Sequence, residues 1–162
     1  MRSGTCRILE FSTMETHFKF NDGGRSEYFK GKGGDCVTRA IAIVTGKDYK
    51  DVYSILAEGN ATQRKGKREG SKAGKKTALR GINTKRKWFQ DLMKSWGFEW
   101  VATMQIGQGC KTHLKADELP DGKIIAFVSR HYTAVIDGVI NDTYDCSRGG
   151  NRCVYGYWKY NG

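Results

Sequence analysis

The stretch Gly33-Gly34-Asp35-Cys36-Val37-Thr38-Arg39-Ala40-Ile41 places a cysteine where a glycine-rich loop gives way to a helix. From Val37 to Val44, apolar residues recur at the i, i+3, i+4 and i+7 spacing of an amphipathic helix. Cys36 therefore falls in the first turn, at the edge of the apolar face. The free N–H groups and the positive end of the helix dipole at such a position favour a thiolate over a thiol. Cys36 is accordingly a candidate nucleophile.

Turn and capping signals divide the first two thirds of the chain into three expected helices. Asp35 is expected to cap the first helix and Gly46 to stop it. A second helix is expected from Asp48 to a stop at Gly59, and a third from about Thr84 to a stop at Gly97.

The remainder of the chain has the composition of a sheet. Helices first and strands last predict an α+β domain in which N-terminal helices pack on a C-terminal antiparallel sheet. We expect a single domain over residues 21–162, preceded by a flexible N-terminal extension over residues 1–20. One helical turn is expected at 116–119, and strands at 98–104, 123–128, 132–136, 139–143 and 153–160.

A hairpin in this sheet brings a histidine close to a carboxylate. Asp137-Gly138 is a strong signal for a two-residue turn. With that turn, Thr133 faces Asp142, and alternation along the strands puts His131 on the same face as its diagonal neighbour. Asp142 is therefore predicted to orient the His131 imidazole. Asp145 is the reserve candidate, because the strand has ended or nearly ended there.

A cysteine that opens a helix, followed by a histidine and an aspartate on later strands, resembles the papain-like cysteine peptidase superfamily. The resemblance rests on the Gly-Asp-Cys36 patch and the His131-hairpin-Asp142 patch, and it covers about a third of the chain. The layout is most similar to bacterial papain-like groups, including the peptidase domains of bacteriocin exporters, and to small phage and prophage proteins. It implies a papain-like fold with Cys36 as nucleophile, His131 as general base and acid, and Asp142 as the orienting group.

The superfamily often completes its oxyanion hole with a glutamine a few residues before the cysteine. Residues 27–32 of this chain contain none. The backbone N–H groups at the helix start are expected to hold the oxyanion. Either Lys30, Gln105 or Gln108 supplies a further donor, or the site is impaired.

The net charge of +11 is concentrated in one segment. Residues 64–87 hold eleven Lys and Arg against the single Glu69, and the chain at about 60–83 is polar and dotted with glycine. We expect a basic loop or insertion there, either merely solvated or attracting a nucleic acid or an acidic protein through its charge. The basic residues are Arg64, Lys65, Lys67, Arg68, Lys72, Lys75, Lys76, Arg80, Lys85, Arg86 and Lys87.

The five cysteines are expected to remain thiols in a cytoplasmic protein, located in the host cytoplasm if it is phage-encoded. The charged N-terminus does not resemble a signal peptide, and no run reaches the ~18 apolar residues of a membrane span. A zinc-stabilised module built from Cys110, His113, Cys146 and Cys153 is an alternative, although only the first two have the spacing of paired zinc ligands. Otherwise no metal or cofactor is expected.

Taken together, these patterns predict a cysteine-dependent hydrolase or acyltransferase that acts on an amide, peptide or isopeptide bond. Its basic loop would recruit an acidic or nucleic-acid-associated target, and no membrane partner is expected. The alternative from another class of protein is a papain-like scaffold without catalysis that binds nucleic acid or protein.

Overall fold

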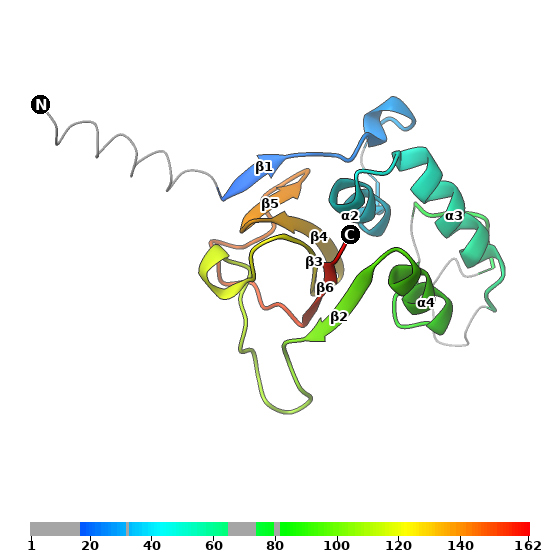
Figure 1. The fold of residues 1–162 in the computed structure, drawn as a ribbon. Helices are drawn as coiled ribbons and strands as arrows, with labels where there is room; N and C mark the ends of the chain where they lie inside the picture. The colour runs from blue at the N-terminus through cyan, green and yellow to red at the C-terminus, as the bar shows by residue number, and fades with distance from the viewer. Residues whose placement is uncertain (1–16, 32, 65–73, 80–81) are drawn as a thin grey trace, which may run out of the picture.

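A six-stranded sheet curves around one side of the domain, and three α-helices cover one of its faces (Figure 1). The computed structural model describes residues 17–31, 33–64, 74–79 and 82–162. The α+β class predicted from the sequence is confirmed. The elements are β1 (Phe18–Phe20), η1 (Arg25–Glu27), α2 (Cys36–Thr45), α3 (Tyr49–Ala61), α4 (Lys87–Ser95), β2 (Phe98–Ala102), η2 (Ala116–Glu118), β3 (Lys123–Val128), β4 (His131–Ile136), β5 (Val139–Asp142) and β6 (Gly156–Tyr160).

The strands lie in the order β1-β5-β4-β3-β6-β2, and one pair runs parallel. All other pairs are antiparallel, but β1 lies parallel to β5, with Phe18 opposite Ile140. The prediction of an antiparallel sheet was therefore wrong at this edge. The prediction of a flexible extension over 1–20 was also wrong for 18–20, because these residues form β1; residues 1–16 lie outside the described part.

The expected helices are present, with corrected ends. α2 begins at Cys36 and stops at Gly46, whose φ of 72° is a left-handed conformation that glycine adopts without strain. α3 begins after Asp48 as expected but continues past Gly59 to Ala61. The glycine lies inside this helix because its missing side chain leaves room for Trp88, whose ring carbon would be only 2.3 Å from an added Cβ.

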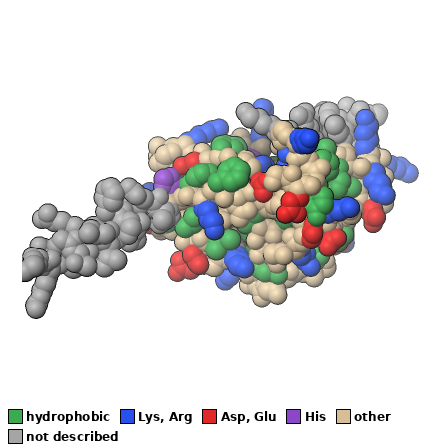
Figure 2. Space-filling model, turned by 90° about the horizontal axis from the view of Figure 1, so that it is seen from above, with side chains coloured by type: hydrophobic (Ala, Val, Ile, Leu, Met, Phe, Trp, Pro, Cys, Tyr) green, Lys and Arg blue, Asp and Glu red, His purple; other side chains and the backbone are tan. Residues whose placement is uncertain are grey.

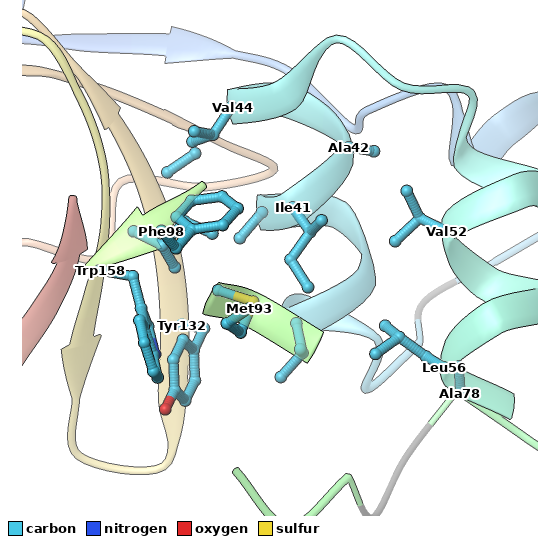
Figure 3. Close-up of a cluster of buried hydrophobic side chains, with 14 of the residues drawn as sticks. Ile41, Ala42, Val44, Val52, Leu56, Ala78, Met93, Phe98, Tyr132 and Trp158 are labelled. Atoms are coloured by element: carbon cyan, nitrogen blue, oxygen red, sulfur yellow. The ribbon is translucent and has the colours of Figure 1, made fainter. Parts of the chain in front are cut away.

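The two faces of the sheet carry separate clusters of buried apolar side chains. On the helical face, the cluster extends from Tyr132 and Trp158 of the sheet past Met93 and Ile41 to Val52 of α3 (Figure 3). On the opposite face lie Ile124, Val135 and Ile140 with Leu114 and Val154. Successive residues of β4 thus alternate between the two clusters, as the period of a strand requires.

The cysteines are not all free thiols. Cys110 and Cys153 form a disulfide across a sequence separation of 43, so the expectation of free thiols was wrong for this pair. Because both sulfurs are bonded to each other, they cannot also serve as the thiolate ligands of the zinc alternative. Cys36 and Cys146 are free. No helix among the described residues is long and apolar enough to cross a membrane.

Candidate active site at the start of helix α2

The fold brings the start of α2 to the end of the sheet where β4 begins. Cys36 is the first residue of α2, and α2 packs against β4. The Asp35 side chain does not cap the helix. It instead forms ion pairs with Arg25 (Nε–Oδ2 2.9 Å) and Arg39 (Nε–Oδ1 3.6 Å) and accepts a hydrogen bond from the Tyr49 hydroxyl. The predicted capping by Asp35 was therefore wrong, and its carboxylate leaves the N–H groups of the first turn uncovered.

A buried hydrogen bond joins the imidazole to the predicted carboxylate. His131 Nε2 lies 2.7 Å from Asp142 Oδ2, and both side chains are more than nine tenths buried. The hairpin register is the one expected, with Ile136 opposite Val139 and Val135 opposite Ile140. The contact between His131 and Asp142 that this register predicts is thereby confirmed.

Asp142 is held on several sides, which keeps its carboxylate ionised. Oδ2 also accepts from the hydroxyl of Thr133 (2.8 Å), Oδ1 accepts from the backbone N–H of Thr143 (2.7 Å), and Arg39 Nη2 lies 4.0 Å from Oδ1. Burial alone would raise the pKa of Asp142, but these hydrogen bonds and the charge of His131 hold it below its usual range.

The imidazole is correspondingly favoured in its charged form. Burial alone would lower the pKa of His131, but hydrogen bonding with Asp142, Cys146 and Cys36, together with the Coulomb interaction with Cys36, raises the pKa well above its ordinary value. The Cys146 sulfur lies 3.8 Å from the same Asp142 oxygen that binds His131. Since Nε2 faces Asp142, Nδ1 is the ring nitrogen that remains available for a proton transfer.

Two cavities meet at Cys36 and His131. The larger, of about 880 Å³, is lined by both residues and by Phe29, Lys30 and Tyr144, among others. The smaller, of about 260 Å³, is lined by the same two residues and by apolar side chains of the helical face. Cys36 is half-buried, so the thiol is accessible from both cavities while the imidazole behind it is enclosed.

The other predicted site residues are distributed as follows. Lys30 lines the larger cavity together with Cys36, as an oxyanion donor would. Gln105 and Gln108 are exposed in the loop after β2 and line neither of the two cavities. Asp145, the reserve orienting residue, pairs with His17 instead (2.8 Å) and does not contact His131. The structure therefore favours Asp142 over Asp145.

The basic segment is described only in part. Lys65, Lys67, Arg68, Lys72 and Arg80 lie outside the described residues. Arg64, Lys75, Lys76, Lys85 and Lys87 are exposed, whereas Arg86 binds Gln63 Oε1 (3.2 Å) and the carbonyl of Arg64 (2.8 Å) and so ties the loop to α4. On the face seen in Figure 2, Lys and Arg side chains alternate with Asp and Glu. Attraction of a polyanion remains a prediction.

The sequence did not predict the residues that surround Cys36, His131 and Asp142. Arg39 and Asp35 are four residues apart on one helix, a spacing that signals an ion pair. Cys146 donates toward Asp142 Oδ2 (3.8 Å) from beyond the hairpin, and nothing in the sequence places it there. His131, Asp142 and Cys146 lie close enough together to ligate a metal ion, but Nε2 and Oδ2 are already joined by a hydrogen bond of 2.7 Å, which leaves no space for one between them.

No protein-family model, curated protein or solved structure matches this chain. The class of protein is therefore inferred from the geometry of the site itself.

Proposed function

We propose that the protein is a cysteine-dependent hydrolase or acyltransferase of papain-like architecture, acting on an amide, peptide or isopeptide bond. The observation that carries the proposal is the arrangement around His131. Its ring is hydrogen-bonded to a buried carboxylate and lines the same two cavities as the thiol at the start of α2. The order of the three residues in the chain supports it as well.

The proposed reaction begins with attack of the Cys36 sulfur on the carbonyl carbon of the substrate. The negative charge that develops on the oxygen is stabilised by the N–H groups at the start of α2, which the Asp35 carboxylate leaves uncovered. The His131 imidazolium then donates its Nδ1 proton to the departing nitrogen, the carbon–nitrogen bond breaks, and a thioester remains on Cys36.

In the second half of the reaction, the neutral imidazole accepts a proton from water or from an amine. That nucleophile attacks the thioester, and the thiol is released when the carbon–sulfur bond breaks. Asp142 stays ionised throughout, because its hydrogen bonds stabilise the carboxylate. Its part is to hold the ring orientation and to stabilise the imidazolium.

The test uses iodoacetamide, an uncharged alkylating reagent, near neutral pH, with the modified cysteine located by mass spectrometry. Cys36 is expected to react at least about tenfold faster than glutathione, because it begins a helix and lines the same two cavities as the His131 imidazole. The free but buried Cys146 serves as an internal comparison and is expected to remain unmodified. p-Nitrophenyl acetate is expected to leave an acetyl thioester on Cys36 that mass spectrometry detects. The Cys36→Ala variant should show no such acetylation.

Two matched pairs of variants separate the triad from general damage. His131→Gln and Asp142→Asn are expected to slow alkylation of Cys36 by about 10- to 100-fold, the equivalent of one charge-assisted hydrogen bond. His113→Gln and Asp145→Asn, whose side chains pair with Glu118 and His17 respectively, are expected to leave the rate unchanged. The proposal fails if Cys36 reacts no faster than glutathione, or if all four variants behave alike.

A further inference from the structure

The larger cavity beside Cys36 has an excess of positive charge. Apart from His131, which is paired with Asp142, four of its lining residues are basic, namely Arg25, Lys30, Arg39 and Arg130, and one, Asp22, is acidic. The Asp22 carboxylate accepts hydrogen bonds from the N–H groups of Gly24 and Ser26 in its own turn (3.0 Å each), and these bonds lower its pKa. Asp22 is therefore ionised and engaged locally.

The four cations fall into two kinds. Arg25 and Arg39 are buried and share the Asp35 carboxylate, and Arg39 also lies 4.0 Å from Asp142, so both are paired within the protein. Lys30 and Arg130 are exposed, and no ion pair joins either of them to any of the described residues. The uncompensated charge of the cavity thus resides on these two side chains.

Arg130 holds a position that an arginine does not favour. It is the second residue of the two-residue turn between β3 and β4, with a φ of 58°, in the left-handed region where glycine is usual. Buried Arg152 fixes the turn from behind by donating to the carbonyl of Ser129. An exposed arginine in a strained backbone conformation that precedes His131 and lines both cavities is suited to binding a ligand rather than to stabilising the turn.

We propose that Arg130, assisted by Lys30, binds a carboxylate of the substrate next to the bond attacked by Cys36, so that the enzyme prefers acidic substrates. A guanidinium matches a carboxylate with two parallel hydrogen bonds, which gives direction as well as attraction. Apart from Arg130 itself and His131, which is engaged by Asp142, the smaller cavity has no basic residue among its described lining residues. Arg130, which lines both cavities, therefore sets the preference for a substrate carboxylate where they meet. The inference rests on the proposed role of Cys36.

The experiment compares iodoacetate with iodoacetamide, two reagents that differ in one carboxylate. The measured quantity is the ratio of their rate constants for alkylation of Cys36, divided by the same ratio for glutathione. We expect this normalised ratio to be about 3 to 10 in the wild type, and to fall toward one as added salt screens the charges. Arg130→Gln is expected to remove most of the excess and Arg130→Lys to keep part of it.

Controls separate the charge of Arg130 from its place in the fold. Arg148 is an exposed arginine that also has a positive φ, 53°, but lines neither cavity, so Arg148→Gln is expected to leave the ratio unchanged. Arg130→Gly relieves the turn and removes the charge together; it is expected to be at least as stable as the wild type and still to lose the ratio. Lys30→Gln is expected to reduce the ratio less than Arg130→Gln.

Each result has one meaning. If Cys36 reacts rapidly with iodoacetamide but the ratio is one, or is unaffected by Arg130→Gln, the inference of an acidic substrate is overturned while the proposed function stands. If Arg130→Gln slows both reagents equally, Arg130 supports the thiol itself and the inference is likewise overturned. If Cys36 does not react rapidly with iodoacetamide in any form of the protein, it is the proposed function that fails.

Discussion

At the scale of single residues, the site depends on one ionised pair with low exposure to water. His131 and Asp142 stabilise each other's charges, and Thr133 and the backbone of Thr143 complete the coordination of the carboxylate. A buried pair of this kind is costly to break from one side, because the remaining charge is left without its partner.

The pair makes a predictable contribution to stability at different pH values. Because the pKa of His131 is raised by folding, its contribution is complete below the ordinary value of about 6.5 and is lost as pH rises above it. Because the pKa of Asp142 is lowered, its contribution is complete above about 3.9 and is lost at lower pH.

In a Cys36→Ala background, where no thiol can give up the proton that His131 keeps, we therefore expect the protein to lose stability relative to the same background with His131→Gln between pH 7 and pH 9, by up to about 1.4 kcal/mol per pH unit. Urea unfolding of both proteins across this range measures the difference. A difference that is flat, or that grows with pH, would show that His131 is neutral in the folded protein. His113→Gln, at a partly exposed histidine, serves as the control.

At the scale of elements, close contacts between a glycine and an aromatic ring decide where helices can approach. Gly59 lies within α3 beneath Trp88 of α4. Helix propensity alone favours alanine over glycine at such a position by about 0.5–1 kcal/mol. A Cβ at 2.3 Å from the ring forces the indole to move, however, and overpacking typically costs about 1–3 kcal/mol.

Gly59→Ala is accordingly expected to destabilise the protein by about 1–2 kcal/mol, with the opposite sign to its helix propensity. Chemical denaturation gives the measurement, and Trp fluorescence should report the displaced ring. Ser54→Ala, on the exposed face of the same helix, is expected to be neutral or slightly stabilising. A stabilised Gly59→Ala protein would mean that α4 moves away from α3 at little cost.

Local sequence patterns were sufficient to predict the elements that carry Cys36, His131 and Asp142. The Asp-Gly turn fixed the register of β4 and β5, and that register brings Asp142 rather than Asn141 to His131. β1 was missed because it is only three residues long and pairs with a strand about 120 residues away. The contacts of the Asp35 carboxylate with Arg25 and Tyr49 were missed because only the folded chain brings these residues to it.

At the scale of the whole molecule, one covalent bond ties the loop after β2 to the segment before β6. The Cys110–Cys153 disulfide closes 43 residues of chain that include β3, β4 and β5. Sequence could not assign this pairing, because the connectivity of cysteines follows from tertiary structure and their spacing indicated instead a weak metal site.

Reduction of this bond is expected to lower the free energy of unfolding by about 4 kcal/mol in the chain-entropy model for a loop of this length. Thermal melts with and without dithiothreitol measure the loss. The Cys153→Ser variant should start from the lower stability and show no further response to the reductant. If dithiothreitol destabilises the Cys153→Ser variant as much as the wild type, the loss of stability comes from other cysteines and not from this disulfide.

The parallel pairing of β1 with β5 has a consequence for the order in which the chain assembles. The N–H of Asn21, the residue after β1, donates to the carbonyl of Asp142 (2.9 Å), so the N-terminal strand stabilises the position of Asp142. During synthesis from the N-terminus, Cys36 emerges long before His131 and Asp142. Cys36 therefore lacks the His131–Asp142 pair until most of the chain has been made, and a partly synthesised chain cannot carry the assembled site.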